Sequence, residues 1–373
     1  MDKKLKIATV FSGIGAVEQA LKRMNIDHEI VFACDNGDIE IDIEPEEELK
    51  KIKKMETVLA KKEYVDSLYS NKTRRTNFVK KSYLANYDID PSKFYLDIRM
   101  LDGTDYENEV DLFVGGSPCQ SFSTVGFQEG LEDTRGTLFY DYARLLNEIH
   151  PKMFIYENVR GLTTHDKGNT WEIMKGVFSQ LNYNIFESVL DAKDYGIPQT
   201  RRRIFVVGVR KDIKIDKNYS FPPKVEDLKF TMQDFLLSKT KLGNFKSINS
   251  KLSLTFEEGY VDPKYILSPK LKKYVMSTGT KGFYQKVEID LPIARTILAT
   301  MGNRHRAGVD NYMTDLGPIR MLTEREAHRL MGFPDDYKIV VSRAQGYRQA
   351  GNSIVVDVLI KILEDMLEYI QWR

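Results

Sequence analysis

Strand-like and helix-like patterns alternate along the first part of the chain, and this alternation constrains the fold more than any other feature. The apolar runs typical of strands are KIATVF, HEIVFACD, DLFVGG, KMFIYEN, NIFESVLD and RIFVVGV. Helical patterns separate most of these runs, as in AVEQALKRM, LFYDYARLLNEI and TWEIMKGVFSQL. The alternation predicts an α/β fold with a doubly wound sheet, which binds its ligands in the loops at the strand ends.

Two regions interrupt this rhythm. Residues 38–81 are rich in Glu and Lys, and their segment EPEEELKKIKKMETVLAKKEYV predicts a charged surface helix inserted between strands, a solvated face in the simplest interpretation. From about residue 212 to 291 the periodicity weakens, which predicts a small separate domain or a loop-rich insertion. The amphipathic SIVVDVLIKILEDMLEYI is expected to form a helix that packs back on the first domain.

Composition limits the classes of protein that fit. The 373 residues are 42% hydrophobic and 29% charged, no apolar stretch reaches membrane-spanning length, and no cleavable signal precedes the first strand, so we expect a cytoplasmic protein. The net charge of +1 is not that of a generic polyanion binder, so any nucleic-acid contact requires segregated charges. The two cysteines form no CxxC pair, and we expect neither a zinc site nor a disulfide framework.

The first candidate site is the segment KIATVFSGIGAVEQAL, which predicts a strand, a glycine turn and a helix. Gly13 and Gly15 let the backbone approach a ligand, and Asp35 follows the next strand, where a carboxylate binds ribose hydroxyls. An ordinary strand-to-helix turn is the alternative. Glu18 stands where the dinucleotide fingerprint has its third glycine and would oppose a pyrophosphate, so a nucleoside cofactor without phosphate, such as S-adenosylmethionine, fits better than NAD.

The second candidate site is the turn in VDLFVGGSPCQSF. Cys119 follows Pro118, whose ring stiffens the turn, whereas Cys34 lies within an apolar strand and is expected to be structural. A thiol at the end of a buried strand is a candidate nucleophile, although an isolated cysteine in a loop more often has no catalytic role.

An acid and a pair of arginines accompany this thiol. In KMFIYENVRGL, Glu157 ends a buried strand, where desolvation raises a carboxyl pKa and favours a general acid; a helix N-cap by Asn158 is the alternative. In GIPQTRRRIFVVGV, Arg201 and Arg203 lie on one side of an extended segment and Arg202 on the other. They suit a phosphate or carboxylate partner, or else form a solvated basic edge.

A thiol, a buried acid and a methyl donor together indicate methylation of an atom that is not nucleophilic by itself. Carbon 5 of a pyrimidine is such an atom, because thiolate addition at carbon 6 with protonation at ring nitrogen 3 converts it into an enamine nucleophile. A base inside a duplex must first be flipped out. The arginines would hold its backbone and favour the thiolate.

The order of these motifs closely resembles the cytosine-5 DNA methyltransferase family, especially the short prokaryotic type of restriction–modification systems. The matching segments, in the family's order from Phe11 to Val356, are FSGIG, GGSPCQSFS, RGTLFYDYARLL, ENVRGL, DYGIPQTRRRIF, RMLTEREAHRLMGFP and GNSIVV. One segment alone is weak evidence, whereas seven in sequence are specific.

The resemblance implies roles for individual residues. Cys119 would be the nucleophile, Glu157 the acid on ring nitrogen 3, and Arg201 and Arg203 supporting groups. Phe11 would stack on adenine, Asp35 would bind ribose, and Asp97 with Ile98 would contact adenine. The implied S-adenosylmethionine pocket comprises Phe11, Ser12, Gly13, Gly15, Asp35, Asp97, Ile98, Pro118, Leu138, Asn352 and Ser353. The implied DNA contacts are Gln120, Ser123, Val125 and Gly126, on a mobile loop over 120–130, and Thr296.

The resemblance also implies a domain organisation and partners. The catalytic and cofactor-binding domain would span 1–211 and 340–373, and the target-recognition domain 212–320. A bridging segment over 321–339 would contain a helix with Thr323 as N-cap and Glu326 in a capping box. Double-stranded DNA would lie between the domains of a monomer without membrane attachment, and a cognate restriction endonuclease is a candidate partner.

The sequence departs from the family pattern in three respects. Asp35 stands where the family usually has Glu, and the insertion over 38–81 is not part of the common core; surface or DNA-end contacts are the roles we expect for it. The neutral net charge requires basic residues to line one cleft: Arg201, Arg202, Arg203, Lys211, Lys214, Arg304 and Arg306.

Three alternatives stay open at this point. The same chemistry acts on transfer RNA in one branch of the family, and the catalytic motifs do not separate the two substrates. A catalytically silent DNA-binding relative is disfavoured by the presence of Cys119, Glu157, Arg201 and Arg203 together. A Rossmann oxidoreductase is disfavoured by Glu18.

Overall fold

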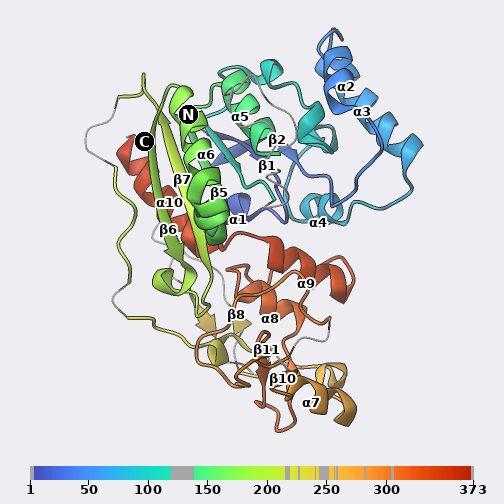
Figure 1. Ribbon diagram of the computed structural model, residues 1–373, viewed down its shortest axis with the longest axis vertical. Coiled ribbons are helices and arrows are strands. Elements are labelled where there is room, and N and C mark those ends of the chain that lie inside the picture. The colour runs from blue at the N-terminus through green and yellow to red at the C-terminus, as the bar shows by residue number, and fades with distance from the viewer. Residues whose placement is uncertain are drawn as a thin grey trace.

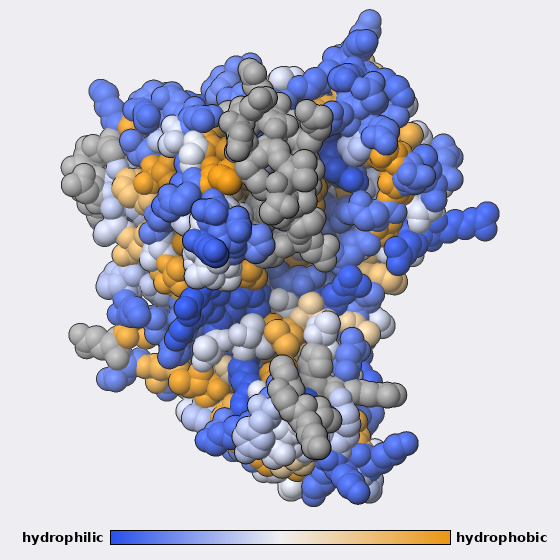
Figure 2. Space-filling view, in the orientation of Figure 1, coloured by the Kyte–Doolittle hydropathy of each residue, from blue (hydrophilic) through white to orange (hydrophobic). Residues whose placement is uncertain are grey.

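The computed structural model describes residues 4–118, 138–214, 219–225, 227–239, 241–242, 252–255, 257, 259–280, 283–303 and 306–370. Its upper part in Figure 1 is a seven-stranded sheet with helices on both faces, and its lower part holds short strands and helices α7 to α9. Figure 2 shows a mostly hydrophilic face with smaller hydrophobic patches. No helix among the described residues is long and apolar enough to cross a membrane.

The sheet confirms the predicted doubly wound α/β class. Its strands are β1 (Leu5–Val10), β2 (His28–Cys34), β3 (Phe94–Tyr95), β4 (Leu112–Gly115), β5 (Met153–Val159), β6 (Tyr183–Asp191) and β7 (Arg202–Arg210). Their spatial order is β3-β2-β1-β4-β5-β7-β6. Strands β1 to β5 are parallel, and β7 pairs antiparallel with both β5 and β6. Six of these strands match the predicted runs, and β3 was not predicted.

Alternating side chains of the strands form two apolar layers. Leu112, Val114 and Ile155 face one layer, which is covered by α1 (Ala16–Arg23) and α10 (Val356–Tyr369). Phe113 and Phe154 face the other layer, which is covered by α5 (Leu138–Ile149) and α6 (Asn169–Gln180). Helix α10 packs on α1, as predicted, and Arg23 and Asp357 form an ion pair of 2.7 Å between these helices.

The charged insertion differs from the single solvated helix that its composition predicts. It forms α2 (Pro45–Ile52), α3 (Val58–Lys72) and α4 (Phe78–Asn86). Their outer faces carry Lys–Glu pairs, but Ile52, Val65 and Tyr69 are buried in a small apolar cluster. These helices lie beyond β2 at one edge of the sheet (Figure 1). The spacing of the few apolar residues was too irregular to predict a buried face.

The lower part contains four short pairs of strands or helices rather than a second large sheet. Its strands are β8 (Lys241–Leu242), β9 (Leu254–Thr255), β10 (Gly279–Thr280), β11 (Phe283–Tyr284), β12 (Tyr312–Met313) and β13 (Arg320–Met321). Its helices are α7 (Pro269–Val275), α8 (Glu324–Arg329) and α9 (Arg343–Asn352). This agrees with the weak periodicity of the region, while the boundaries of the predicted domains remain predictions.

The start of α8 confirms the predicted capping box. The Thr323 hydroxyl accepts a hydrogen bond from the Glu326 N–H at 3.1 Å, and the Glu326 carboxylate accepts one from the Thr323 N–H at 2.7 Å. Buried Arg320 ion-pairs with this same carboxylate at 2.8 Å and with Asp315 at 2.7 Å. The buried charges are therefore neutralised together, and α8 is fixed where the lower part meets the sheet.

The strand order determines where a ligand can bind. The order reverses between β1 and β4, so the loops after these strands open on a crevice at the carboxyl edge of the sheet. The glycine turn follows β1, Asp35 follows β2, and the GGSP segment ends β4. The two candidate sites of the sequence therefore share one edge.

Candidate active site

Two glycines at the end of β4 let the backbone pass unusually close to its neighbours. A Cβ at Gly115 would lie 2.6 Å from a methyl group of Val10, and one at Gly116 would lie 2.6 Å from the Glu157 carbonyl oxygen. The same Gly116 Cβ would lie 2.9 Å from the Glu157 Oε2 atom. Gly116 therefore presses the start of the GSPC turn against the Glu157 carboxylate.

Glu157 is the predicted acid, and β5 places it in a largely dehydrated position. Its side chain is 14% exposed and ion-pairs with the Nε atom of Arg203 at 3.1 Å. Arg203 reaches it because β7 runs antiparallel beside β5, with Arg203 opposite Val159. Burial raises the pKa of Glu157, while the charges of Arg203 and Arg201 lower it in part. The carboxyl is thus biased toward the protonated form that a general acid needs.

Asn158 anchors the GSPC turn instead of capping a helix. Its Nδ2 donates to the Ser117 carbonyl at 2.9 Å and lies 2.8 Å from the Tyr156 hydroxyl, and its Oδ1 accepts from the Val159 N–H. The Ser117 and Tyr156 hydroxyls are 2.7 Å apart. The N-cap alternative is therefore wrong, because this buried amide spends its hydrogen bonds on holding β4 to β5 at the turn.

Arg201 lies close to Glu157 but is fully used in holding the backbone. Its guanidinium donates to the carbonyls of Ile297 at 2.9 Å, Gly351 at 2.9 Å and Ser353 at 2.8 Å. Burial and the nearby Arg203 lower the pKa of Arg201. Arg201 thereby joins the end of β7's entry segment to the lower part and to the segment before α10.

The neighbouring Gln199, which sequence analysis did not select, makes a similar connection. Its amide donates to the Leu330 carbonyl at 2.7 Å and accepts from the Ile297 N–H at 2.9 Å. Thr296, predicted to contact DNA, donates its hydroxyl to the Thr200 carbonyl at 2.6 Å and is exposed. Gln199 and Arg201 therefore fix the segment that carries Thr296 beside the strand that carries Arg203.

The predicted cofactor residues gather at the ends of β1 and β2. The Asp35 carboxylate accepts the N–H groups of Gly13 at 2.9 Å and Gly37 at 2.8 Å. Burial raises the pKa of Asp35 to about 6. The Ser12 hydroxyl donates to the carbonyl of Thr9 and accepts from the Cys34 N–H, so it holds the turn at the strand ends.

The predicted adenine contacts lie on one apolar cluster. Phe11 and Leu138 are partly buried against the cluster that contains Ile98. Asp97 is 4% exposed, and its carboxylate binds the Arg99 guanidinium and the Tyr69 hydroxyl.

The other predicted cofactor residues are less uniform. Ser353 is buried and its hydroxyl donates to the Ile354 carbonyl, whereas Asn352 and Pro118 are exposed. Gly15 has a φ of 77°, and a Cβ there would lie 2.1 Å from the Tyr87 ring. Gly15 is therefore needed for contact with Tyr87, in addition to its positive φ.

Several predicted residues lie outside the described part of the chain. These are Cys119, Gln120, Ser123, Val125 and Gly126, together with Arg304. Lys211 and Lys214 follow the end of β7 that is opposite to Arg202 and Arg203, so the expectation that all these basic residues line one cleft is wrong. Arg306 lies over the Tyr274 ring at 5.2 Å.

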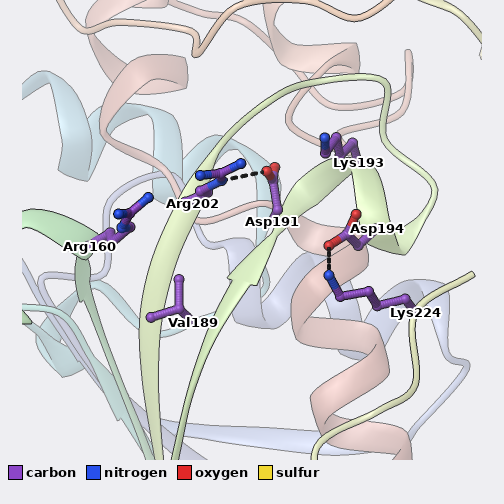
Figure 3. Close-up of a pocket in the computed structure, with 7 residues that line it drawn as sticks. All are labelled: Arg160, Val189, Asp191, Lys193, Asp194, Arg202 and Lys224. Carbon is purple, nitrogen blue, oxygen red and sulfur yellow. Dashed lines mark hydrogen bonds and ion pairs between the residues drawn. The ribbon is translucent and has the colours of Figure 1, made fainter.

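A basic pocket adjoins the strand ends beside Glu157 and Arg203. It has a volume of about 390 Å³ and is lined by Arg160, Val189, Asp191, Lys193, Asp194, Arg202 and Lys224. Figure 3 shows the ion pairs of Arg202 with Asp191, at 3.1 Å, and of Lys224 with Asp194, at 2.8 Å. Four cationic side chains face two carboxylates, so the lining carries a positive excess.

Comparison with known proteins agrees with this geometry. The family model described as C-5 cytosine-specific DNA methylase matches residues 47–368. The chain belongs to this family. It is 36% identical over 299 residues to the type II methyltransferase M.SsoII of Shigella sonnei, covering 78% of this chain and 71% of that protein. It is 38% identical over 250 residues to M.HhaI of Haemophilus parahaemolyticus, covering 67% and 73%.

Solved structures share the fold at lower sequence identity. The S. pombe Dnmt2 methyltransferase superposes with a TM-score of 0.65 at 19% identity, covering 98% of this chain and 99% of that one. The Entamoeba histolytica methyltransferase EhMeth superposes with a TM-score of 0.64 at 14% identity, covering 98% and 99%. These likenesses establish the S-adenosylmethionine-dependent methyltransferase fold. The resemblance inferred from the seven motifs is therefore confirmed, as is the assignment to the DNA cytosine-5 methyltransferase class of enzymes.

Replacing Gly116 by Ala tests the close contact with Glu157. The added methyl group would force the carboxylate or the β4 end to shift, so methyl transfer to DNA should slow by about 10- to 100-fold, because small misplacements of catalytic groups are costly. Gly161→Ala is the matched control, since a Cβ at Gly161 meets nothing within 4 Å. Wild-type turnover by a folded Gly116→Ala variant would contradict the role given to this contact.

Proposed function

We propose that this methyltransferase modifies carbon 5 of cytosine within a short, specific sequence of duplex DNA, after flipping the target base out of the helix. The observation that carries the proposal is the Glu157 carboxylate, which is mostly buried, ion-paired to Arg203 and in contact with Gly116. Gly116 opens the GSPC turn, and the sequence of that turn supplies Cys119. An acid of raised pKa thus accompanies the candidate thiol nucleophile.

The proposed reaction assigns one task to each residue. The Cys119 thiolate forms a bond to carbon 6 of the flipped base while Glu157 donates a proton to ring nitrogen 3, which leaves carbon 5 as an enamine nucleophile. S-adenosylmethionine supplies the methyl group. Removal of the proton from carbon 5 then breaks the carbon–sulfur bond and restores the aromatic base and the thiolate. Arg203 orients Glu157, and Arg201 acts as a positioning residue because its guanidinium holds three backbone carbonyls.

The residues at the strand ends fit the proposed cofactor. Each Asp35 oxygen accepts one backbone N–H and retains acceptor capacity for a ribose hydroxyl. Phe11, Ile98 and Leu138 share an apolar surface suited to a purine ring. Asp35 is shorter than the family's usual Glu, but the two N–H groups aim its carboxylate from the turn after β2.

The basic pocket supports a polynucleotide substrate. Arg160 directly follows β5 and Arg202 opens β7, so the strands that carry Glu157 and Arg203 also carry this positive lining. A phosphodiester is the ligand class that such a lining attracts without reading sequence. We favour DNA over transfer RNA because the relatives above 30% identity are type II DNA methyltransferases, whereas the Dnmt2 likeness at 19% identity bears on the fold alone.

Cys119→Ser tests the nucleophile and the substrate in one assay. Methyl transfer should fall by at least about 1,000-fold, since the hydroxyl is not ionised at neutral pH, while S-adenosylhomocysteine binding measured by calorimetry should persist. Incorporation of labelled methyl groups should be compared on genomic duplex DNA and on transfer RNA. Near-normal turnover by the variant would remove Cys119 from the mechanism, and labelling confined to RNA would refute DNA as the substrate.

The pH dependence of cofactor binding tests Asp35. A carboxylate with a pKa of about 6 is ionised above that pH and becomes protonated below it, so it then accepts the ribose hydroxyls less well. The dissociation constant of S-adenosylhomocysteine should be constant above about pH 7 and rise about tenfold by pH 5. Asp35→Asn should bind weakly without this slope, and a flat wild-type profile would contradict the assignment.

The basic pocket is tested by removing two of its cations. In Arg160→Gln with Lys193→Gln, the KM for DNA should rise and the slope of log affinity against log salt should decrease by about 2, roughly one per phosphate contact. The turnover number should change little. Lys211→Gln with Lys214→Gln removes the same charge beyond the opposite end of β7 and serves as the control. Equal salt slopes for both double variants would contradict a phosphate site in this pocket.

A further inference from the structure

We propose that the helical insertion, defined as α2 to α4 (Pro45–Asn86), is a wall of the cofactor site and that Tyr69 is the positioning residue for Asp97. The inference rests on the proposed function, in which Asp97 and Asp35 bind the nucleoside of the cofactor. It assigns a role to a segment that is absent from the common core of the family and whose charged sequence predicted only surface contacts.

Asp97 is held from two directions. The Tyr69 hydroxyl, on α3, donates to Asp97 Oδ2 at 3.0 Å, and Tyr69 is itself only 5% exposed. Arg99 binds the same carboxylate through its backbone N–H at 3.0 Å, its Nε at 2.9 Å and a terminal amino group at 2.7 Å. Arg99 also reaches Glu40 at 3.1 Å. A carboxylate fixed in this way presents a single orientation to a ligand.

Asp35 is fixed by the turn that Asn77 supports. The Asn77 amide donates to the Asp35 carbonyl at 2.8 Å, and its Oδ1 accepts from the Lys80 N–H at 2.8 Å as the N-cap of α4. Gly37 has a φ of 64°, and a Cβ there would lie 2.4 Å from Asn77 Oδ1. Asn77 thus fills the space beside Gly37, whose N–H holds the Asp35 carboxylate.

Two tyrosines of the same segment reach the glycine turn. The Tyr87 hydroxyl donates to the carbonyl of Gly15 at 2.6 Å and lies 3.1 Å from that of Ile14. The Tyr83 hydroxyl donates to Glu18 at 2.5 Å, so this carboxylate is directed toward α4. The segment therefore contacts the loops after β1 and β2 and the start of η2 (Ile98–Met100), the three places where the nucleoside contacts are predicted.

The charges of the insertion point elsewhere. Lys50 pairs with Glu47 and Lys51 with Glu48 on exposed α2, and Tyr64 of α3 donates to Glu48 at 2.6 Å within the insertion. Helix α3 thus carries two tyrosine-to-carboxylate hydrogen bonds, one internal and one to Asp97. This pair provides a matched comparison of the same chemical change at the two sites.

Tyr69→Phe and Tyr64→Phe should be compared by calorimetry with S-adenosylhomocysteine and S-inosylhomocysteine. The latter replaces the adenine amino group, the donor that Asp97 would accept, by a carbonyl. Loss of the Tyr69 hydroxyl should weaken S-adenosylhomocysteine binding by about tenfold and reduce the preference over S-inosylhomocysteine, because a hydrogen bond to a charged group is lost. The turnover number at saturating S-adenosylmethionine should stay within about twofold, and Tyr64→Phe should match the wild type.

The outcomes separate this inference from the proposed function. If the wild type binds neither ligand, the proposed cofactor is wrong. If it binds and Tyr69→Phe equals Tyr64→Phe, or loses both ligands to the same extent, the positioning role is overturned. Should Tyr69→Phe fail to fold, Arg99→Gln removes the other partner of Asp97 and is expected to reduce the same preference; an unchanged preference there also overturns the inference.

Discussion

The arrangement depends on one carboxylate held out of water between three strands. Glu157 on β5 has its ion-pair partner on antiparallel β7 and the backbone of β4 against its other side. A buried carboxylate is costly unless a charge or donor compensates it, so Arg203 must be delivered at this register, and β7 must enter the sheet beside β5. The approach of β4 requires glycine at Gly116, because any side chain would displace the acid.

The rest of the molecule holds these strand ends in place. Asn158 and Ser117 tie the turn after β4 to β5, and Arg201 and Gln199 tie the entry of β7 to the lower part through backbone carbonyls. Each of these polar side chains is buried, and each hydrogen bond satisfies a backbone group that would otherwise be unpaired. The same contacts that stabilise the junction thereby set the positions of Thr296 and Arg203 relative to one another.

Sequence reasoning predicted the elements with a clear period and the motifs at their ends. The strand runs, the helix ending at Tyr369 and the Thr323 capping box are local features, so a single sequence suffices to find them. The insertion was predicted poorly because its buried positions depend on partners distant in the sequence, such as Tyr69 with Asp97. No local signal distinguishes Tyr69 from exposed Tyr64, nor shows that Gly15 is required by Tyr87.

The most direct test of the account is to trap and map the covalent intermediate. Duplex DNA synthesised from a genomic template with 5-fluorocytosine blocks release of the enzyme, since after methyl transfer carbon 5 carries fluorine and no proton to remove. With S-adenosylmethionine present, digestion and mass spectrometry should find the methylated, fluorinated nucleotide on the sulfur of Cys119. An adduct on the buried Cys34, an adduct on any other residue, or no adduct at all would contradict the account.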